Sequence, residues 1–273
     1  MNRRRILALT CSFFLSLLLT IGCSRPQSTE PQANSATLVS SSEQTELTVS
    51  AAASLTDAME AIQPLYEQEY PNVKLIYNFA SSGSLQQQIE QGAPVDVFIS
   101  AAPKQMNALE EKGLIMNETR KDLLKNQMVL IVREENDSVN SFEDLITNKV
   151  TKIAVGEPES VPAGKYAQEV LISLNLLKSV QPKEVYTKTV RQVLSYVETG
   201  NVEAGIVYSS DAKISDQVKI VTTASTENHS PILYPAAVTK DSNHQEVAEE
   251  FIQFLSSDPA KSVFEKYGFG LIN

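Results

Sequence analysis

Short apolar runs alternate with helix-like patterns along most of this chain, and that alternation restricts the fold more than any other feature. The strand candidates are near-continuous apolar runs, as buried parallel strands are. They lie at 47–52, 73–79, 95–99, 128–132, 152–155, 204–208, 218–221 and 232–238. The helix candidates between and after them lie at 55–69, 84–91, 103–111, 142–146, 163–174, 190–198, 245–255 and 259–267. Strands that alternate with helices are typical of α/β proteins, so we expect mainly parallel sheets flanked by helices.

Two of the predicted strands run into helix starts that carry small hydroxyl residues. The run 73–79 leads to Ser82, and the run 47–52 leads to Ser54. A helix start leaves backbone N–H groups unpaired and carries partial positive charge, so it suits a small anion. Each serine alone is more often a helix cap. Because both follow the carboxyl end of a strand, where ligands of α/β sheets bind, they predict one anion held from two sides.

The second half of the chain offers further donors of the same kind. Pro162 suits the first position of a helix, which leaves the N–H groups of Ala163 and Gly164 directed along the helix axis. Thr189 is a plausible cap for the next helix. A later strand ends at Tyr208, whose hydroxyl can donate one hydrogen bond far from its backbone. These positions extend the predicted anion site.

The N-terminus has the pattern of a secretory signal peptide. Three arginines at 3–5 precede an apolar run at 6–21, which is short for a membrane-spanning helix. The run ends at Gly22 and Cys23, and residues 20–23 resemble a bacterial lipoprotein signal, although that pattern prefers leucine where Thr20 stands. We therefore expect a signal peptide at 1–22 and a lipid on Cys23. The alternative is a signal peptide cut elsewhere, with Cys23 incidental.

Composition separates a tether from a folded region and narrows the choice of partner. Residues 24–46 have almost no large apolar side chain, so we expect 23–46 to form a lipidated, flexible tether. Residues 47–273 are enough for one large domain or two lobes. The formal net charge is −10, and removal of the three signal arginines would lower it by three, to −13. This balance argues against nucleic acid as a partner, and an anion site here would rely on local dipoles.

Five sequence blocks occur in an order that is more specific than any one of them. They are 51–55 (AAASL), 79–83 (FASSG), 92–101 (GAPVDVFISA), 155–164 (VGEPESVPAG) and 205–208 (GIVY). Together they resemble the periplasmic molybdate-binding proteins of ABC transporters, and the resemblance covers essentially all of 47–273. It implies a two-lobed periplasmic-binding-protein fold of type II, with a hinge between the lobes. We expect lobe 1 to comprise 47–125 plus 230–273, and lobe 2 to comprise 126–229.

The resemblance also implies a set of ligand-binding residues. Ser54 and Ser82 would bind an oxyanion from the first lobe, through hydroxyl and N–H groups. Backbone N–H groups at Ala163 and Val190 and the hydroxyl of Tyr208 would bind it from the second lobe.

Two nearby residues receive separate expectations. Gly83 stands where many relatives have serine, which would remove one outer hydroxyl. We expect Arg191 on a solvated helix face or paired with a carboxylate rather than on the anion.

The function implied is capture of molybdate or tungstate and delivery to the membrane permease subunits of an ABC transporter. We expect no other cofactor, no enzymatic activity, a monomer, and an extracytoplasmic lipoprotein anchored to the membrane. Two alternatives stay open, namely a binder of another oxyanion such as sulfate, and a secreted hydrolase. The hydrolase has little support, because His229 and His244 show no metal-ligand spacing and no Ser–His–Asp order is present.

Overall fold

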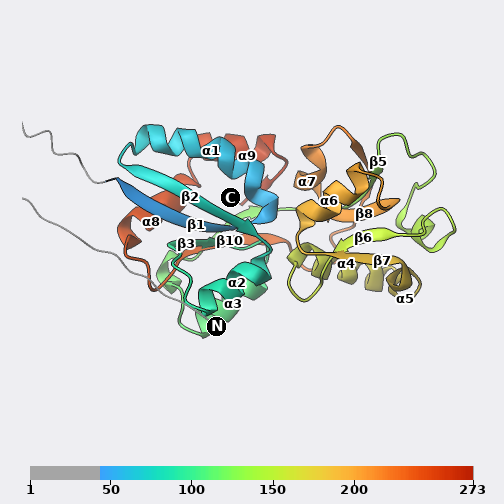
Figure 1. Cartoon of the computed structure of the whole chain (residues 1–273), viewed down its shortest axis with the longest axis horizontal. Helices are drawn as coiled ribbons and strands as arrows, with labels where there is room; N and C mark the ends of the chain where they lie inside the picture. The colour runs from blue at the N-terminus through green and yellow to red at the C-terminus, as the bar shows by residue number, and fades with distance from the viewer. Residues whose placement is uncertain (1–43, 273) are drawn as a thin grey trace, which may run out of the picture. The chain divides into compact units, whose positions relative to one another are not determined.

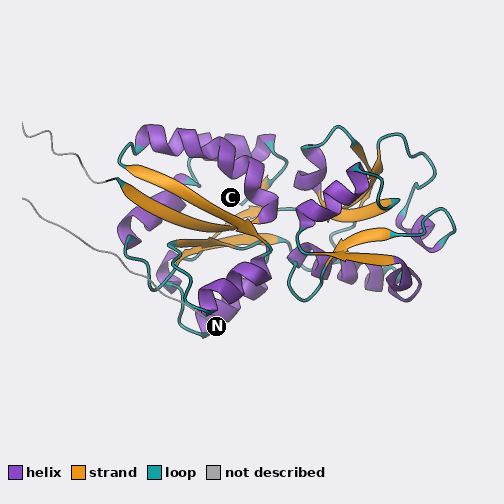
Figure 2. Ribbon diagram, viewed as in Figure 1, coloured by secondary structure: helices purple, strands orange, loops and turns teal. Residues whose placement is uncertain are grey.

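The computed structural model describes residues 44–272, which form two mixed β-sheets flanked by helices (Figures 1 and 2). The predicted signal peptide, Cys23 and the tether up to residue 43 lie outside the described residues. Strand β1 begins at Thr45, which pairs with Val73, so the last two residues assigned to the tether belong to a sheet. Among residues 44–272, no helix is long and apolar enough to cross a membrane.

The first sheet has the strand order β11-β4-β10-β3-β1-β2. Its strands are β1 (Thr45–Ala52), β2 (Val73–Ala80), β3 (Val97–Ile99), β4 (Lys121–Lys125), β10 (Leu233–Val238) and β11 (Gly270–Leu271). Strand β1 is parallel to β2 and β3, whereas β10 is antiparallel to β3 and β4, and β11 to β4. Leu47 and Val49 of β1, which lies between β3 and β2, are fully buried.

Helices cover both faces of this sheet (Figure 1). Helices α1 (Thr56–Glu69) and α9 (Asp258–Lys266) pack against each other on one face. Helices α2 (Ser82–Glu90) and α3 (Pro103–Glu111) pack against each other on the opposite face. Helix α8 (Gln245–Phe254) contacts β10, and the short 3-10 helices η1 (Ala53–Leu55) and η2 (Asn117–Thr119) lie in the connections.

The second sheet has the strand order β7-β6-β8-β5-β9. Its strands are β5 (Met128–Arg133), β6 (Ile153–Gly156), β7 (Glu184–Thr187), β8 (Ala204–Tyr208) and β9 (Val218–Thr223). Strand β6 is parallel to β7 and β8, and β5 is antiparallel to β8 and β9. All five residues of β8 are buried, which accounts for its unbroken apolar sequence.

Helices also cover this sheet on both faces (Figure 1). Helices α6 (Val190–Glu198) and α7 (Ser209–Lys213) lie on one face. Helices α4 (Pro162–Ser173) and α5 (Leu177–Val180) lie on the other. Two 3-10 helices, η3 (Phe142–Ile146) and η4 (Gln181–Lys183), complete the described elements.

Both sheets are mixed, where mainly parallel sheets were expected. The reason lies in how the chain passes between them. Strand β4 ends at Lys125 and β5 begins at Met128 in the second sheet. The chain returns between Thr223, which ends β9, and Leu233, which begins β10. Strands β5 and β10 are the first strands after these two passages, and each is antiparallel to its neighbours. An antiparallel strand needs no crossover helix, so the chain can enter each sheet directly, which makes both sheets mixed.

Three strands were missed from the sequence, namely β4, β7 and β11. Strand β4 reads Lys-Asp-Leu-Leu-Lys and buries only its two leucines, so it lacks an apolar run. In β7 only Thr187 is buried. Strand β11 has only two residues, too few to form a pattern. The helix expected at 142–146 is the 3-10 helix η3. These elements depend on pairing partners far along the chain rather than on local apolar content.

Helix α4 starts unusually close to strand β6, and two glycines allow the approach. A Cβ atom added to Gly164 would lie 1.9 Å from the carbonyl oxygen of Gly156. Such a contact is sterically forbidden, so any side chain at position 164 would push the helix start away from the strand end. The first turn of α4 is therefore held next to the carboxyl end of β6.

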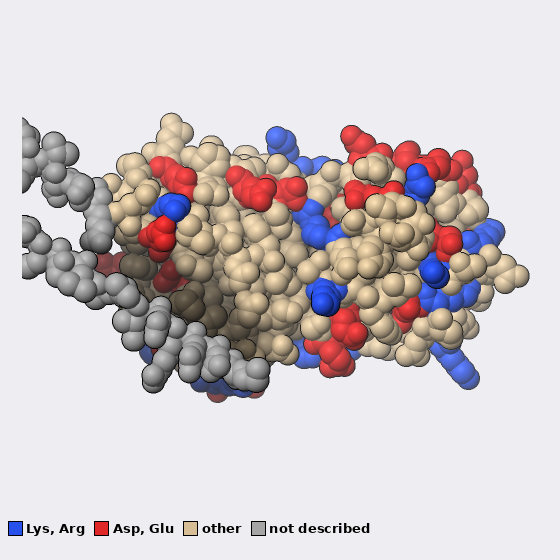
Figure 3. Space-filling view, in the orientation of Figure 1, with Lys and Arg blue, Asp and Glu red and all other residues tan. Residues whose placement is uncertain are grey.

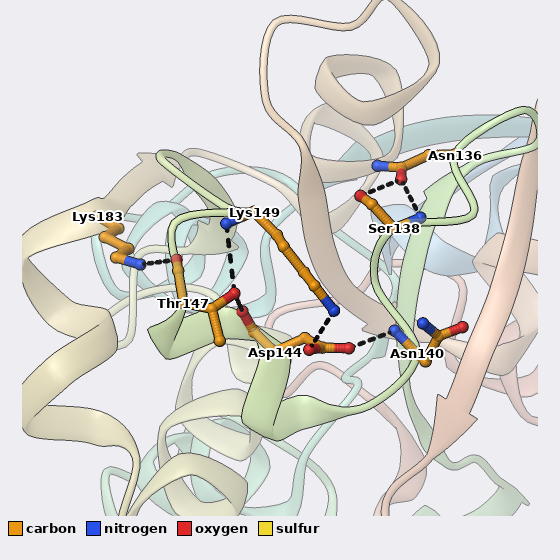
Figure 4. A network of polar contacts seen from close by, with 7 residues as sticks. All are labelled: Asn136, Ser138, Asn140, Asp144, Thr147, Lys149 and Lys183. Carbon is orange, nitrogen blue, oxygen red and sulfur yellow. Dashed lines mark hydrogen bonds and ion pairs between the residues drawn. The ribbon is translucent and has the colours of Figure 1, made fainter.

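The connection between β5 and β6 is held by polar contacts (Figure 4) in addition to buried apolar side chains such as Phe142 and Leu145. The carboxylate of Asp144 accepts hydrogen bonds from the backbone N–H of Asn140 and from Lys149, at 2.7 and 2.8 Å. Lys183 donates to the carbonyl of Thr147 at 2.7 Å. The hydrogen bond from Lys149 lowers the pKa of Asp144, so its carboxylate stays ionised at neutral pH. These contacts fix a segment that contains little regular structure.

Charged side chains of both signs are intermixed on the face of the molecule in Figure 3. On that face, Lys and Arg residues lie scattered among Asp and Glu residues and do not form a single basic patch. Nucleic-acid binding depends on clustered positive charge.

Candidate functional site

All five predicted ligand-binding residues line one small cavity. Ser54, Ser82, Ala163, Val190 and Tyr208 surround it. Their elements, η1, α2, α4, α6 and β8, belong to both halves of the described structure. Residues separated by up to about 150 positions in the sequence thus meet at the carboxyl ends of strands, where α/β folds bind ligands.

Ser54 occupies η1, the single turn that connects β1 to α1. It is 2% exposed, and its Oγ lies 3.0 Å from the Oη of Tyr234. Its carbonyl oxygen accepts a hydrogen bond from Arg191 at 3.1 Å. The side chain is therefore held on the wall of the cavity, and a hydroxyl there can donate to a bound group.

Ser82 is the first residue of α2 and is fully buried. The preceding residue, Ser81, caps the helix by accepting the N–H of Ser84 at 3.2 Å. Because Ser81 performs the capping, the hydroxyl of Ser82 is available for another role. Its Oγ accepts the backbone N–H of Ala101 at 2.9 Å, which leaves the hydroxyl hydrogen to donate toward the cavity.

Helix α4 presents one backbone donor where two were expected. The N–H of Gly164 donates to the carbonyl of Val161 at 2.9 Å, so it is already paired. Pro162 has no N–H, and the N–H of Ala163 has no acceptor inside the helix. The close approach of α4 to β6 brings Ala163, which carries this N–H, to the cavity wall.

Helix α6 begins at Val190, with Thr189 as its cap. The Oγ1 of Thr189 accepts the N–H of Gln192 at 3.2 Å. The carbonyl of Thr189 accepts the N–H of Gln192 and of Val193, at 3.2 and 3.4 Å. The N–H of Val190, at the first helical position, has no acceptor within the helix and can serve a ligand.

Tyr208 ends strand β8 and is 1% exposed. Its hydroxyl donates to the carbonyl of Ala101 at 3.5 Å, which is a long and weak hydrogen bond. Burial raises the pKa of Tyr208 well above its usual range, so the phenol keeps its hydrogen at neutral pH. A bound anion could compete for this donor.

Arg191 is paired with carboxylates, one of the two alternatives that the sequence left open. Its Nη2 lies 2.6 Å from Asp57, and its Nε lies 2.9 Å from the fully buried Asp211, without hydrogen-bond alignment. Burial raises the pKa of Asp211 to about 6, against the opposing effect of the Arg191 guanidinium. The positive charge of Arg191 is therefore already compensated, and the donors around the cavity are electrically neutral.

Two residues outside the cavity lining were missed from the sequence. Tyr234 and Asn126 lie behind Ser54, and the Nδ2 of Asn126 is 3.2 Å from the Oη of Tyr234. Tyr234 sits in β10 and Asn126 between β4 and β5, so both belong to the passages of the chain between the sheets. Their only sequence signal was a polar residue inside an apolar context, which does not by itself distinguish a site.

Other arrangements within residues 44–272 are less suited to a small ligand. No group of three or more His, Cys, Asp or Glu side chains there could hold a metal ion. A larger hollow, of about 670 Å³, lies between α3 and α4. Its lining carries charges of both signs, from Lys104 and Lys165 and from Glu111 and Glu169.

The geometry agrees with a comparison against protein families. The sequence profile of the family described as bacterial extracellular solute-binding protein matches residues 47–270. The chain belongs to this family.

YvgL of Bacillus subtilis is one related solute-binding protein, named provisionally as an ABC transporter substrate-binding lipoprotein. It is 47% identical to this chain over 255 residues, which cover 93% of this chain and 94% of YvgL. The molybdate-binding protein ModA of Haemophilus influenzae is 41% identical over 228 residues, covering 82% of this chain and 89% of its own. A solved substrate-binding domain from Clostridium difficile, assigned provisionally to a molybdenum ABC transporter, is 49% identical with a TM-score of 0.67, covering 84% of this chain and 100% of its own. This solute-binding protein is thus homologous to molybdate-binding proteins of ABC transporters, and its two-lobed α/β fold is that of its family.

Proposed function

We propose that this protein captures molybdate or tungstate between its two lobes and delivers the anion to the permease subunits of an ABC transporter. The observation that carries the proposal is the convergence of neutral donors on one cavity. Ser54, Ser82 and Tyr208, which carry hydroxyls, and Ala163 and Val190, which open helices, line it together. The homology to molybdate-binding proteins supports the same ligand.

Neutral donors suit a tetrahedral dianion for two physical reasons. Fixed dipoles need little reorganisation, and no buried counter-charge has to lose its water. A hydrogen bond to an ionised acceptor is stronger than one between neutral groups. A protonated phosphate would bring a hydrogen that finds no acceptor among these donors, which disfavours phosphate.

Calorimetric titration of the purified protein with molybdate, tungstate, sulfate and phosphate tests this proposal. We expect tight binding of molybdate and tungstate and much weaker binding of sulfate and phosphate, as the homology to molybdate-binding proteins suggests. Preference for sulfate would show that the proposed ligand is wrong, although the protein would still be an oxyanion-binding protein. Hydrolysis of ester or phosphate substrates by the protein would contradict our inference that it is not an enzyme.

We further infer that the mature protein is a monomer, held outside the cytoplasm by a lipid on Cys23. The lipoprotein named among its relatives supports the anchor. Substitution Cys23→Ser should move the protein from the membrane fraction to the soluble fraction. Its molybdate affinity should stay unchanged, because the cavity is lined by residues between Ala52 and Tyr208. A loss of affinity in the soluble variant would contradict this division between anchor and site.

A further inference from the structure

The hydroxyl of Ser54 can in principle point either way, and only one direction is useful to an anion. A serine hydroxyl has one hydrogen to donate and two lone pairs that accept. If Ser54 donated its hydrogen to Tyr234, the Oγ would turn a lone pair toward a bound oxyanion and repel it. Something in the structure therefore has to decide the direction of the Ser54–Tyr234 hydrogen bond, which measures 3.0 Å.

The side chain of Asn126 supplies a fixed starting point. Its Oδ1 accepts the backbone N–H of Gln127 and the hydroxyl of Ser209, both at 2.9 Å. A backbone N–H can only donate, so the oxygen of this amide must lie on that side. The Nδ2 then donates to Ser210 at 2.8 Å and to Tyr234 at 3.2 Å. All of the amide's contacts are satisfied in one orientation.

Tyr234 connects Asn126 to Ser54 through two hydrogen bonds of fixed direction. Its Oη accepts from Asn126, and within residues 44–272 the one acceptor in contact with its own hydrogen is the Oγ of Ser54. Tyr234 is fully buried, and burial raises the pKa of its hydroxyl, so the phenol stays protonated and able to donate. The hydrogen of Ser54 is then left for the cavity.

We propose that Asn126 and Tyr234 are positioning residues that fix the Ser54 hydroxyl as a donor to the bound oxyanion. This inference rests on the proposed function. Ser82 reaches the same state by a different route, because a backbone N–H, that of Ala101, occupies its Oγ. The direction of Ser82 is set by the main chain, whereas that of Ser54 is set by side chains and can be changed by mutation.

We call the series of hydrogen bonds from Asn126 to Tyr234 to Ser54 the relay. A double-mutant cycle between Ser54→Ala and Tyr234→Phe tests it, with calorimetric molybdate affinity as the readout. When Ser54 is present, Tyr234→Phe removes one neutral hydrogen bond of the relay and should weaken molybdate binding by about 3- to 10-fold. In the Ser54→Ala background, Tyr234→Phe should change affinity by less than about twofold, because it has no hydroxyl left to direct. Equal losses in both backgrounds, or no loss in either, would overturn the relay.

A second variant keeps the test independent of how well Tyr234→Phe folds. In Asn126→Asp a carboxylate accepts the Tyr234 hydrogen, which reverses the relay and turns the Ser54 lone pair inward. The added charge weakens anion binding in both backgrounds, so the relay predicts an additional loss that occurs only when Ser54 is present. If the loss is the same with Ser54→Ala, the relay is wrong.

Tyr166→Phe is the matched control. Tyr166 is also buried, and its hydroxyl donates to the carbonyl of Pro231 at 3.3 Å, outside the relay. The molybdate affinity of Tyr166→Phe should equal that of the unmutated protein. A loss like that of Tyr234→Phe would mean that removal of any buried hydroxyl in this region lowers affinity, which would contradict a specific role for Tyr234.

The unmutated protein separates this inference from the proposed function. If it binds another oxyanion instead of molybdate, the proposed ligand is wrong and the cycle is decided with that anion. If it binds no oxyanion, both inferences fail.

Discussion

The two lobes contribute different kinds of donor to the proposed site. The first lobe offers the side-chain hydroxyls of Ser54 and Ser82, whereas the second offers backbone N–H groups at Ala163 and Val190 together with the hydroxyl of Tyr208. A side-chain donor must be aimed by its neighbours and disappears on substitution. A backbone donor at a helix start is aimed by the helix and survives most substitutions. The lobes should therefore respond very differently to mutation.

The largest effect is expected at Ser82, on the side-chain half of the site. Ser82→Ala removes a hydroxyl donor to a buried dianion, worth about 1.5–3 kcal/mol, so molybdate affinity should fall by about 10- to 150-fold. Titration calorimetry at one salt concentration measures this. Tyr208→Phe is the matched variant on the other lobe, since it deletes a hydroxyl and keeps the ring. If both variants bound molybdate like the unmutated protein, the assignment of these hydroxyls would be wrong.

The next effect concerns the contact between the lobes at Gly83. The N–H of Gly83 donates to the carbonyl of Ser160 at 3.0 Å, and a Cβ at position 83 would lie 2.5 Å from that oxygen. Overpacking of this kind costs about 1–2 kcal/mol, so Gly83→Ser should lower affinity by about 5- to 30-fold. The added hydroxyl should not compensate. Thermal melting of the ligand-free protein is the control, and equal losses of stability and affinity would contradict an effect specific to closure.

A smaller effect is expected from Thr189, which supports a backbone donor without contacting the anion. Thr189→Ala removes the cap of α6 and should lower the free energy of unfolding by about 0.5–2 kcal/mol. The loosened first turn should weaken molybdate binding by about 2- to 5-fold, because only part of that loss falls on the N–H of Val190. Ser257→Ala, at the cap of α9, is the matched control and should destabilise without changing affinity. If Thr189→Ala left the molybdate affinity unchanged, the assignment of the Val190 N–H as a donor to the anion would be wrong.

The smallest effect is expected at Ala163. Ala163→Gly keeps the backbone N–H, so affinity should change by less than about twofold even if the added backbone freedom costs about 0.5–1 kcal/mol of stability. Urea unfolding and calorimetry on the same sample separate the two quantities. A tenfold loss of affinity would show that the Ala163 side chain, and not its N–H, serves the ligand.

The sequence was sufficient for those parts of the molecule whose signal is local. Ser54 and Ser82 follow apolar strands directly and open helical turns, and Pro162 marks the start of α4. Each of these is a strand-to-helix junction, which a short window of sequence reveals. The α/β class followed from the same alternation.

What the sequence could not supply depends on contacts between distant positions. Asn126 and Tyr234 are 108 residues apart, and no local pattern connects them. Gly83 was interpreted as the loss of an outer hydroxyl, whereas the structure shows that it makes room for the backbone of Ser160. The N–H of Gly164 was expected to be free, but its pairing with Val161 depends on the geometry of the turn. Strand β4 carries three charged residues and is recognisable only by its partners.

The neutrality of the donors around the cavity has a consequence for proton exchange. Serine hydroxyls and backbone N–H groups do not titrate in water, and burial raises the pKa of Tyr208 further from neutrality. Asp211, with a pKa raised to about 6, is ionised above pH 7. Capture of a dianion at pH 8–9, well above that pKa, should therefore neither take up nor release a proton. The calorimetric heat of binding should then be the same in buffers of different ionisation enthalpy.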